Sequence, residues 1–397
     1  LTVWSQVFSN SASVGGICLG SSNFVASTST GQFLVSANGT AWQATTPEPV
    51  PLGCRNIEFL NGQFVAVEGN QLSFSSDGSV WTNTITISNL NDSATLTSIT
   101  FGHGRYVAGG AYGPVWTSLD GVNWTNPAPD LSTFPDYTDV HVAFGNDVFV
   151  GAAGDQADIL TSSDGLSWTV RQLITNTSSP VSFSDITFGN GRFVAVSPSL
   201  AATSIDGQNW ETSPLQYPIT AATAGNGKFV GVGFGIVAVS SDGLNWVYQN
   251  SSDFYGLYDV SFGAGWFVAT GNEALPAPPT EAPIWISQDG VHWFKRHSST
   301  SRRLYCTAFG DGTFVLAGGG AVLQSDPLLT LDLVVNPAPI LRISGPVDRA
   351  YRVEFSDGLG PGQSWSVLTN VTANQSPISI GDTNAPSRFY RAALLPN

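Results

Sequence analysis

Apolar and polar residues alternate along this chain in short segments that are separated by glycine-containing turns. In a representative stretch, Ile186 and Phe188 alternate with polar neighbours, and the apolar residues of 193–196 follow shortly after. This alternation predicts two short strands, and Gly189-Asn190-Gly191 between them predicts a tight hairpin that needs positive φ. The block recurs eight times between Leu19 and Phe309.

A second block, Ser-x-Asp-Gly-x-x-Trp, follows the first seven copies. It predicts a third strand that ends at the Ser, a turn at Asp-Gly and a fourth strand that begins at the Trp. The carboxylate is expected to accept backbone N–H groups and the indole to pack inward, so these residues are predicted to be structural. The Asp positions are Asp77, Asp120, Asp164, Asp206, Asp242 and Asp289, with Asn38 in the remaining copy.

Each pair of blocks therefore predicts a four-stranded antiparallel sheet. Such sheets cannot bury both faces alone, so radial stacking predicts an all-β propeller, eight-bladed or alternatively seven-bladed. In the last unit Pro327 follows Asp326 and no Trp appears. The N-terminal segment 3–7, which contains Trp4, is therefore predicted to supply the missing fourth strand and close the ring.

The Ser-x-Asp-Gly-x-x-Trp turns resemble the Asp boxes, or bacterial neuraminidase repeats, of secreted Asp-box β-propellers. The resemblance covers residues 1–327. In that family the Asp box is structural and lies away from the catalytic face. Members include sialidases, other glycosidases, sorting receptors and assembly factors, so the resemblance implies a fold and leaves the activity open.

The repeat stops at Leu328. Residues 328–339, which end in Asn-Pro-Ala-Pro, are predicted to be a linker, and residues 340–397 a small C-terminal β-sandwich. This last segment is similar to C-terminal modules of exported verrucomicrobial and planctomycetal proteins. The similarity implies a role in tethering, sorting or docking.

Composition narrows the classes of partner. With 42% hydrophobic residues the chain is globular, and its net charge is −15 with only 14 Lys and Arg residues, which argues against nucleic acid. No apolar run approaches the roughly 18 residues of a membrane span. The chain starts at Leu1 and contains no Met, which favours an exported, extracellular or cell-surface protein whose signal peptide has been removed.

The three cysteines are an odd number, so at least one is expected not to pair within the chain. Cys18 and Cys306 fall on adjoining blades near the ring closure. A disulfide between them is one interpretation, and two thiols are the other.

Topology places the Asp boxes and Gly-x-Gly hairpins on one face of the propeller, and the loops between second and third strands, with the blade connections, on the other. On this second face blade seven has a Pro-rich insertion that ends near Glu281. Basic residues, rare elsewhere, follow closely. Lys295, Arg296, His297, Arg302 and Arg303, with Glu281, are predicted either to bind an anionic partner or to form a solvated loop beside a stiff insertion.

A second group of polar residues falls on the innermost strands: Glu58, His141, Asp185 and Asp259. They are predicted to line the central channel. His141 and Asp185, on adjacent blades, form a candidate acid–base or metal pair. The favoured interpretation is that these side chains cap backbone groups of neighbouring blades. No metal site and no cofactor is assigned.

The functional prediction is a non-catalytic extracellular structural or interaction protein, a self-assembling surface, matrix or filament subunit. Self-association is expected through the C-terminal module or exposed strands. No Ser-His-Asp elbow, phosphate loop or Cys-His zinc spacing occurs. A sialidase needs three converging arginines; Arg55 and Arg303 could reach the mouth of the propeller, but no third inner-strand arginine is visible. The alternative is a glycan-binding module, or a glycoside hydrolase that uses two carboxylates.

Overall fold

In the computed structural model, the described residues form strands and one turn of 3-10 helix, η1 Ser252–Phe254. In the described part of the chain, no helix has the length and apolar character needed to span a membrane. The described residues are 4–9, 12–21, 23–45, 56–86, 96–110, 115–127, 139–153, 157–173, 181–254, 256–272, 281–310, 312–325, 330–335, 339–344, 350–357, 364–372, 378–381 and 388–394.

Eight sheets of the described chain correspond one for one to the sequence units, and each runs as an antiparallel meander from an inner to an outer strand. Blades one to four consist of β2 Val14–Leu19, β3 Phe24–Thr28, β4 Phe33–Ser36, β5 Gln43–Ala44; β6 Asn56–Leu60, β7 Gln63–Glu68, β8 Gln71–Ser75, β9 Thr82–Thr86; β10 Leu96–Gly102, β11 Arg105–Gly110, β12 Trp116–Ser118; and β13 His141–Gly145, β14 Val148–Ala153, β15 Asp158–Ser162, β16 Thr169–Gln172.

Blades five to eight continue the pattern, and the last takes its outer strand from the N-terminus. They consist of β17 Asp185–Gly189, β18 Arg192–Val196, β19 Leu200–Ser204, β20 Glu211–Pro214; β21 Ala221–Gly225, β22 Lys228–Gly233, β23 Ile236–Ser240, β24 Val247–Asn250; β25 Leu257–Gly263, β26 Trp266–Gly271, β27 Ile284–Ser287, β28 Phe294–Arg296; and β29 Cys306–Gly310, β30 Thr313–Gly318, β31 Ala321–Ser325, β1 Trp4–Ser9.

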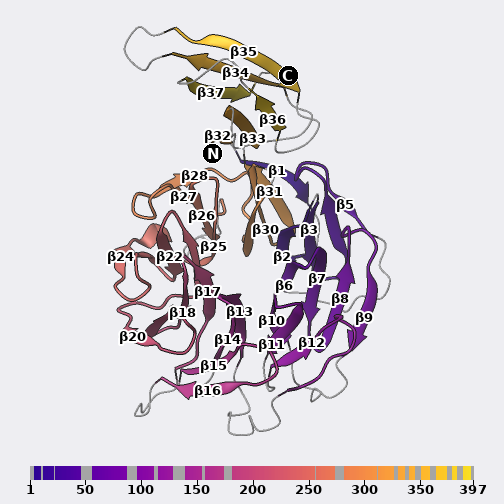
Figure 1. Cartoon of the computed structure of the whole chain (residues 1–397), viewed down its shortest axis with the longest axis vertical. Coiled ribbons are helices and arrows are strands. Elements are labelled where there is room, and N and C mark those ends of the chain that lie inside the picture. The colour runs from indigo at the N-terminus through magenta and orange to yellow at the C-terminus, as the bar shows by residue number, and fades with distance from the viewer. Residues whose placement is uncertain are drawn as a thin grey trace.

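The sheets form a closed ring around a central axis (Figure 1). Inner strands of consecutive blades contact one another around the ring, and β29 of blade eight contacts β2 of blade one. The predicted closure is confirmed, because β1 pairs antiparallel with β31 and places Trp4 opposite Ser325. The predicted β-propeller is therefore the fold of this part of the chain.

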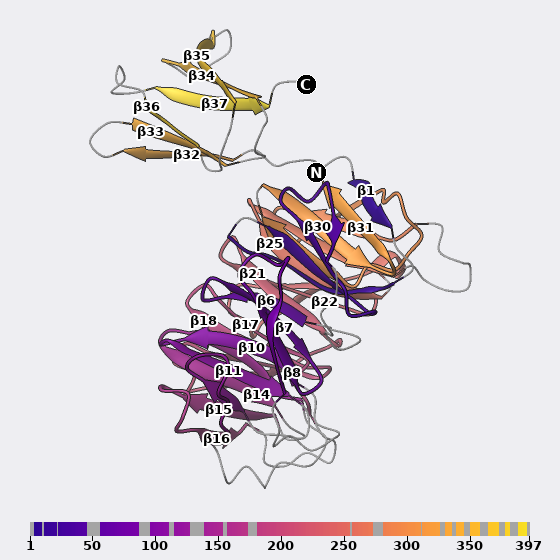
Figure 2. The ribbon, with the colours of Figure 1, turned by 90° about the vertical axis from the view of Figure 1, so that its right-hand side faces the viewer.

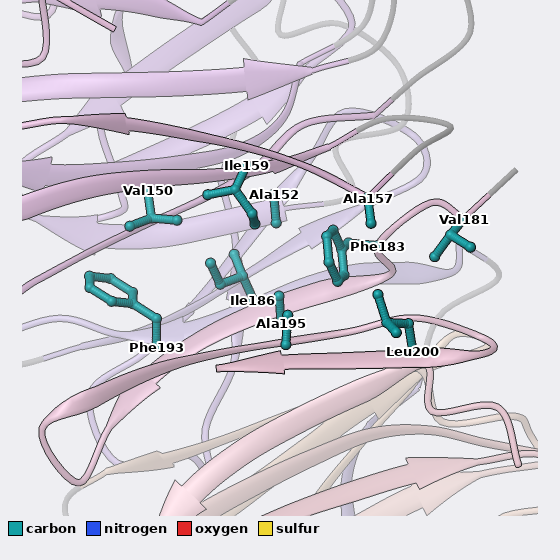
Figure 3. Packing of buried hydrophobic residues seen from close by; sticks show 11 residues of the cluster. Val150, Ala152, Ala157, Ile159, Val181, Phe183, Ile186, Phe193, Ala195 and Leu200 are labelled. Atoms are coloured by element: carbon teal, nitrogen blue, oxygen red, sulfur yellow. The ribbon is translucent and has the colours of Figure 1, made fainter. Parts of the chain in front are cut away.

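The hydrophobic core lies between blades. Figure 3 shows the interface of blades four and five, where Val150 and Ile159 face Ile186 and Phe193. Phe183, in the connection between the two blades, completes the cluster. Because each sheet has an apolar face on both sides, every blade depends on its neighbours for burial.

The two glycines of each Gly-x-Gly hairpin have separate structural roles. The second and third hairpin residues have positive φ, 51° at Asn190 and 75° at Gly191, which is the type I′ turn that a two-residue hairpin favours. The first glycine is needed for a different reason: a Cβ on Gly145 would come within 2.3 Å of the Phe188 ring of the next blade. The inner-strand phenylalanines of the repeat therefore pack on the glycines of the preceding blade.

The C-terminal residues form two three-stranded sheets that share one core, as predicted for a small sandwich, and Figure 2 shows them beyond the edge of the propeller. Leu341 and Ile343 of one sheet pack with Tyr351 and Val353 of the other. The strands are β32 Thr330–Val335, β33 Pro339–Ser344, β34 Ala350–Ser356, β35 Ser366–Thr372, β36 Ile378–Gly381 and β37 Phe389–Leu394.

The prediction that residues 328–339 are a linker is wrong for most of their length. Residues 330–335 form β32, which pairs with β33 from Thr330↔Ser344 to Val335↔Pro339. Pro339, the last residue of the Asn-Pro-Ala-Pro segment, lies at the end of this pair opposite Val335, as expected for a residue that is tolerated at strand ends. The sandwich therefore includes residues that were assigned to the linker.

Substitution of Trp4 provides a test of the ring closure. Its side chain is buried and packs between Ile284 of blade seven and Phe314 of blade eight. We expect Trp4→Ala to lower the free energy of unfolding by about 3–5 kcal/mol, because a large buried side chain is lost and a cavity remains. Ser5→Ala, at the exposed neighbouring position, should change it by less than about 0.5 kcal/mol. Chemical denaturation of the purified variants measures both, and equal stabilities would contradict the closing role of Trp4.

Candidate functional site

We call the end of the propeller that bears the hairpins and Asp boxes the Asp-box face, and the opposite end the connection face. On the Asp-box face the geometry of one representative turn shows how its carboxylate is hydrogen-bonded. Asp120 Oδ1 accepts N–H groups of Val122 at 2.8 Å and Asn123 at 2.7 Å, and the Ser118 hydroxyl at 3.0 Å. The Trp124 indole donates to the Gly121 carbonyl at 2.8 Å.

The same arrangement recurs in the other Asp boxes. Hydrogen bonds from backbone N–H groups hold the pKa of each carboxyl below its usual range, to about 2 for Asp164. The residues with a lowered pKa are Asp77, Asp120, Asp164, Asp206, Asp242 and Asp289. Their oxygens are occupied in building turns, as their structural assignment predicted.

Side chains at the hairpin tips also connect neighbouring blades on this face. Asn190 donates to the Lys228 carbonyl at 3.1 Å, and the Lys228 ammonium donates to the Asp289 carbonyl at 2.8 Å. Asn226 likewise donates to the Gln288 carbonyl at 3.0 Å. The polar groups of the Asp-box face therefore serve cohesion between blades, and the search for a binding site moves to the other face.

The inner strands begin at the connection face, and their first polar side chains bond to the next blade. Asp185 accepts the Ala222 N–H at 2.9 Å, and Asp259 accepts the Thr307 N–H at 2.8 Å. Ser98 accepts the Val142 N–H at 2.8 Å in the same way. This geometry supports the capping interpretation for Asp185 and Asp259 over a free acid–base role.

Glu58 differs from these capping residues, although it too lies on an inner strand. Among the residues that the structure describes, none hydrogen-bonds its carboxylate. Burial raises its pKa to about 7, and the charges of Asp259 and Asp185 raise it further. These three carboxyls come from the inner strands of blades two, seven and five. We refer to Glu58, Asp185 and Asp259 as the axial carboxylates.

The other axial carboxylates are shifted in the same direction. Burial raises the pKa of Asp259 to about 6 against the opposing effect of its backbone hydrogen bonds. Burial also raises the pKa of Asp185, while the same kind of bond and the neighbouring His141 lower it. The described residues contain no group of three His, Cys, Asp or Glu side chains that could hold a metal ion. His141 and Asp185 therefore interact electrostatically here.

Two exposed tyrosines stand at the connection-face end of the axis. Tyr258 and Tyr305 immediately precede Asp259 and Cys306, and their ring centroids are 5.6 Å apart. About a third of each side chain is exposed, at 37% and 36%. The equivalent positions on other blades carry no aromatic residue: Gly15, Arg55, Thr97, Val140, Ser184 and Thr220, of which Arg55 lies outside the described residues.

The basic residues run from the outer strand of blade seven to the inner strand of blade eight. His297 Nδ1 lies 2.9 Å from Glu281 Oε2, so the end of the insertion does meet the basic segment, while residues 273–280 lie outside the described chain. The Arg302 guanidinium donates to the Gly319 carbonyl at 2.6 Å. Arg303 is exposed two residues before Tyr305.

Lys295 and Arg296 lie earlier in the same segment, on the outer strand β28 of blade seven. The Arg296 guanidinium lies 5.8 Å from the centre of the Phe294 ring, which is itself exposed. The predicted basic group is thus spread from the outer strand of blade seven to the segment before the inner strand of blade eight, where Arg303 lies two residues before Tyr305. Blades seven and eight therefore carry the predicted basic residues and the tyrosine pair.

The structure contradicts a disulfide between Cys18 and Cys306, because both are thiols. On strand β2 successive side chains face opposite sides, and Ile17 packs toward blade eight while Cys18 packs toward Phe59 of blade two. Cys306 faces blade one and donates to the Ala317 carbonyl at 3.5 Å. Burial raises the pKa of its thiol, so it remains protonated.

The tyrosine pair was not identified from the sequence. The signal was present, because aromatic residues stand in the repeat position that is small, polar or aliphatic on the other described blades. Comparing the first residues of all inner strands would have found it. What no single repeat indicates is that the two rings meet, since this depends on the approach of blades seven and eight.

A scan against protein-family models finds no match for the sequence. A search of curated proteins finds no related sequence either. Solved β-propeller structures do match the fold. BamB from Moraxella catarrhalis has a TM-score of 0.58 at 11% identity and covers 81% of this chain and 97% of its own. The computationally designed Ika8 protein has a TM-score of 0.58 at 12% identity and covers 80% of this chain and 98% of its own. A streptogramin B lyase has a TM-score of 0.52 at 12% identity and covers 81% of this chain and 96% of its own.

These matches show the propeller fold and leave its activity open, since they include a lyase and a designed protein. Their sequences are too different for residue roles to be transferred. The assignment of function therefore depends on the side chains of this chain.

Glu58 provides a test of the axial electrostatics. A carboxyl whose pKa is raised on folding favours the protonated folded state, so its contribution to stability is present below the ordinary pKa of 4.5 and is lost as pH rises through about 7. We expect Glu58→Gln to raise the melting temperature at pH 8 by about 1–3 °C and to leave it nearly unchanged at pH 4.5. Thermal unfolding of both proteins across this pH range measures the difference. A constant difference at every pH would contradict the assignment.

Proposed function

We propose that this chain is a non-catalytic extracellular interaction protein that binds its partner on the connection face at blades seven and eight. The observation that carries the proposal is the exposed pair Tyr258 and Tyr305, whose ring centroids lie 5.6 Å apart, with the exposed Arg303 two residues before Tyr305 in sequence. Exposed aromatic rings next to an arginine are the composition found at the centre of protein binding sites.

Binding is favoured over hydrolysis by the state of the axial carboxylates. A glycoside hydrolase needs two carboxyls that flank a scissile bond. The pKa of Glu58, raised to about 7, would suit a general acid. However, Asp185 and Asp259 are engaged by backbone N–H groups of the following blade. This arrangement supports a rigid binding surface. We propose a protein as its ligand, and a glycan with carboxylate or sulfate groups is the alternative.

The binding face is tested with two double variants. Tyr258→Ala/Tyr305→Ala and Arg302→Ala/Arg303→Ala are each expected to weaken binding at least about tenfold, because aromatic and arginine side chains supply most of the binding free energy at such sites. Arrays of neutral, carboxylated and sulfated oligosaccharides, and titration of the native protein against itself, provide the measurements.

Arg171→Ala is the matched control, because it removes an exposed arginine from the outer strand of blade four. It is expected to leave binding unchanged. Equal binding by all three variants and the parent protein would argue against the connection face as the site.

We propose in addition that the C-terminal sandwich mediates self-association. In its sheet β35-β34-β37 both edge strands expose a large apolar residue, Val367 at 51% and Phe389 at 43%. Unpaired edges with apolar side chains favour strand addition, and a second copy of the chain would present the same edge.

Native mass measurement tests this second proposal. We expect the parent protein to exceed its chain mass of 41.7 kDa, and Val367→Asp/Phe389→Asp to shift it toward the monomer, because a charge on each edge disfavours pairing. Val247→Asp is the control, since Val247 is 65% exposed on an outer propeller strand. A monomeric parent protein, or the same shift for the control, would contradict self-association through the sandwich.

A further inference from the structure

We propose that the outward face of the C-terminal sheet β35-β34-β37 binds an uncharged polysaccharide built from all-equatorial, glucose-type sugars. This site goes beyond the one proposed at blades seven and eight and shares no residue with it. The proposal rests on an exposed aromatic ring beside a guanidinium group that a carboxylate and a second aromatic ring hold in place.

Strand register and burial place the relevant side chains on one face of this sheet. Val353 of β34 is buried in the sandwich core, so the next residue, Glu354, faces outward. Arg391 of β37 and Val367 of β35 both lie opposite Glu354, and the three form one row across the sheet. Phe389 precedes Arg391 by two residues and therefore faces the same way.

This face is turned away from the propeller. Sheet β32-β33-β36 lies nearer the propeller and sheet β35-β34-β37 farther from it in both views of the chain (Figure 1, Figure 2). Phe389, Val367 and Arg391 are all exposed. Within the described chain the propeller does not cover these side chains, so a long polymer can lie along the sheet.

Arg391 is held in one orientation before any ligand binds. Its Nε donates to Glu354 Oε2 at 2.6 Å, and its guanidinium carbon lies 4.4 Å from the centre of the Trp365 ring. A fork that is already fixed loses little side-chain entropy when it binds a ligand. A guanidinium has five N–H donors, and among the described residues only the Nε–H is engaged, so the others can donate to sugar hydroxyls.

Phe389 supplies the apolar half of the site. The face of an aromatic ring carries partial negative charge and attracts C–H groups. An all-equatorial pyranose presents axial C–H groups on both faces and directs its hydroxyls outward in the ring plane. Phe389 and Arg391 have Cα atoms about 7 Å apart along the strand, so one sugar can stack on the ring and hydrogen-bond to Arg391 and Glu354.

The charges of the module favour an uncharged polymer. Arg391 and Glu354 neutralise each other, and the ten charged side chains of residues 328–397 cancel, so the net charge of −15 resides on the propeller and repels polyanions. Arg352, also exposed on this face, lies at least about 13 Å from Phe389 along the sheet. The ten are Arg342, Arg349, Arg352, Arg388, Arg391, Asp332, Asp348, Glu354, Asp357 and Asp382, of which Asp348, Arg349 and Asp382 lie outside the described residues.

Calorimetric titration of the full chain with cellohexaose tests the proposal, and a hexamer of galacturonate is the anionic comparison. We expect cellohexaose to bind with an affinity that changes less than about twofold between roughly 0.05 and 0.5 M NaCl, because no net charge is neutralised. The galacturonate hexamer should bind at least about tenfold more weakly, because the chain repels it.

Variants of the two exposed residues locate the site. Phe389→Ala should weaken cellohexaose binding at least about fivefold, and Phe389→Trp should retain it, because the ring face carries the stacking. Arg391→Lys keeps a positive charge beside Glu354 but loses the planar fork, so it should weaken binding about as much as Arg391→Ala does. Unfolding temperatures close to that of the parent protein verify that these variants fold.

Two control variants remove aromatic rings elsewhere. Phe234→Ala removes an exposed phenylalanine from the turn between β22 and β23 of blade six, and Tyr258→Ala/Tyr305→Ala removes the tyrosines of the connection face. Both should bind cellohexaose as the parent protein does.

No binding of cellohexaose, or equally tight binding of the galacturonate hexamer, would overturn the inference. Undiminished binding by Phe389→Ala and Arg391→Lys, or an equal loss in either control variant, would overturn it too. The proposed function is decided separately, at blades seven and eight by the Arg302→Ala/Arg303→Ala variant. Strand addition between sandwiches would extend the sheet in its plane and leave this face free, so self-association is decided by native mass.

Discussion

Burial of each sheet between two neighbours is the constraint on which the rest of this propeller depends. A four-stranded blade has apolar side chains on both faces, so a blade at an open end would expose one of them to water. A closed ring has no open end and so leaves no blade face exposed. Closure needs a fourth strand for the last sheet, which the chain after β31 does not supply. Pairing of β1 with β31 provides that strand and places Trp4 in the interface of blades seven and eight.

The same constraint explains the fine structure of the repeat. Inner-strand phenylalanines can pack closely on the preceding blade only where that blade has a glycine, as Phe188 does against Gly145. Hairpin asparagines and Asp-box carboxylates then satisfy the polar backbone on one face of the ring. The Asp-box face is consequently devoted to cohesion, and side chains that depart from the repeat gather on the connection face.

Acidic, aromatic and basic residues occur on the connection-face side of the propeller, and blades seven and eight carry the aromatic and most of the basic ones. Acidic side chains lie at the axis, tyrosines at its end, and basic residues extend outward toward the rim. The axial aspartates illustrate how one residue can serve both structure and electrostatics: Asp259 caps a backbone N–H of blade eight and also contributes to the field at Glu58.

The sequence by itself determined the elements that depend on local pattern. Alternation, hairpin glycines and the Ser-x-Asp-Gly-x-x-Trp turn were enough to predict the strands, the propeller, the N-terminal closure and the structural role of residues such as Asp120, because each of these is specified within a few tens of residues. The prediction of a linker at 328–339 was wrong because the prolines there are compatible with both a spacer and a hairpin, and only the pairing of β32 with β33 distinguishes them. Tertiary structure alone decided which inner-strand side chains meet. Whether Cys18 faces Cys306 and whether the rings of Tyr258 and Tyr305 meet depend on the approach of different blades, and the local sequence around each residue does not specify that approach.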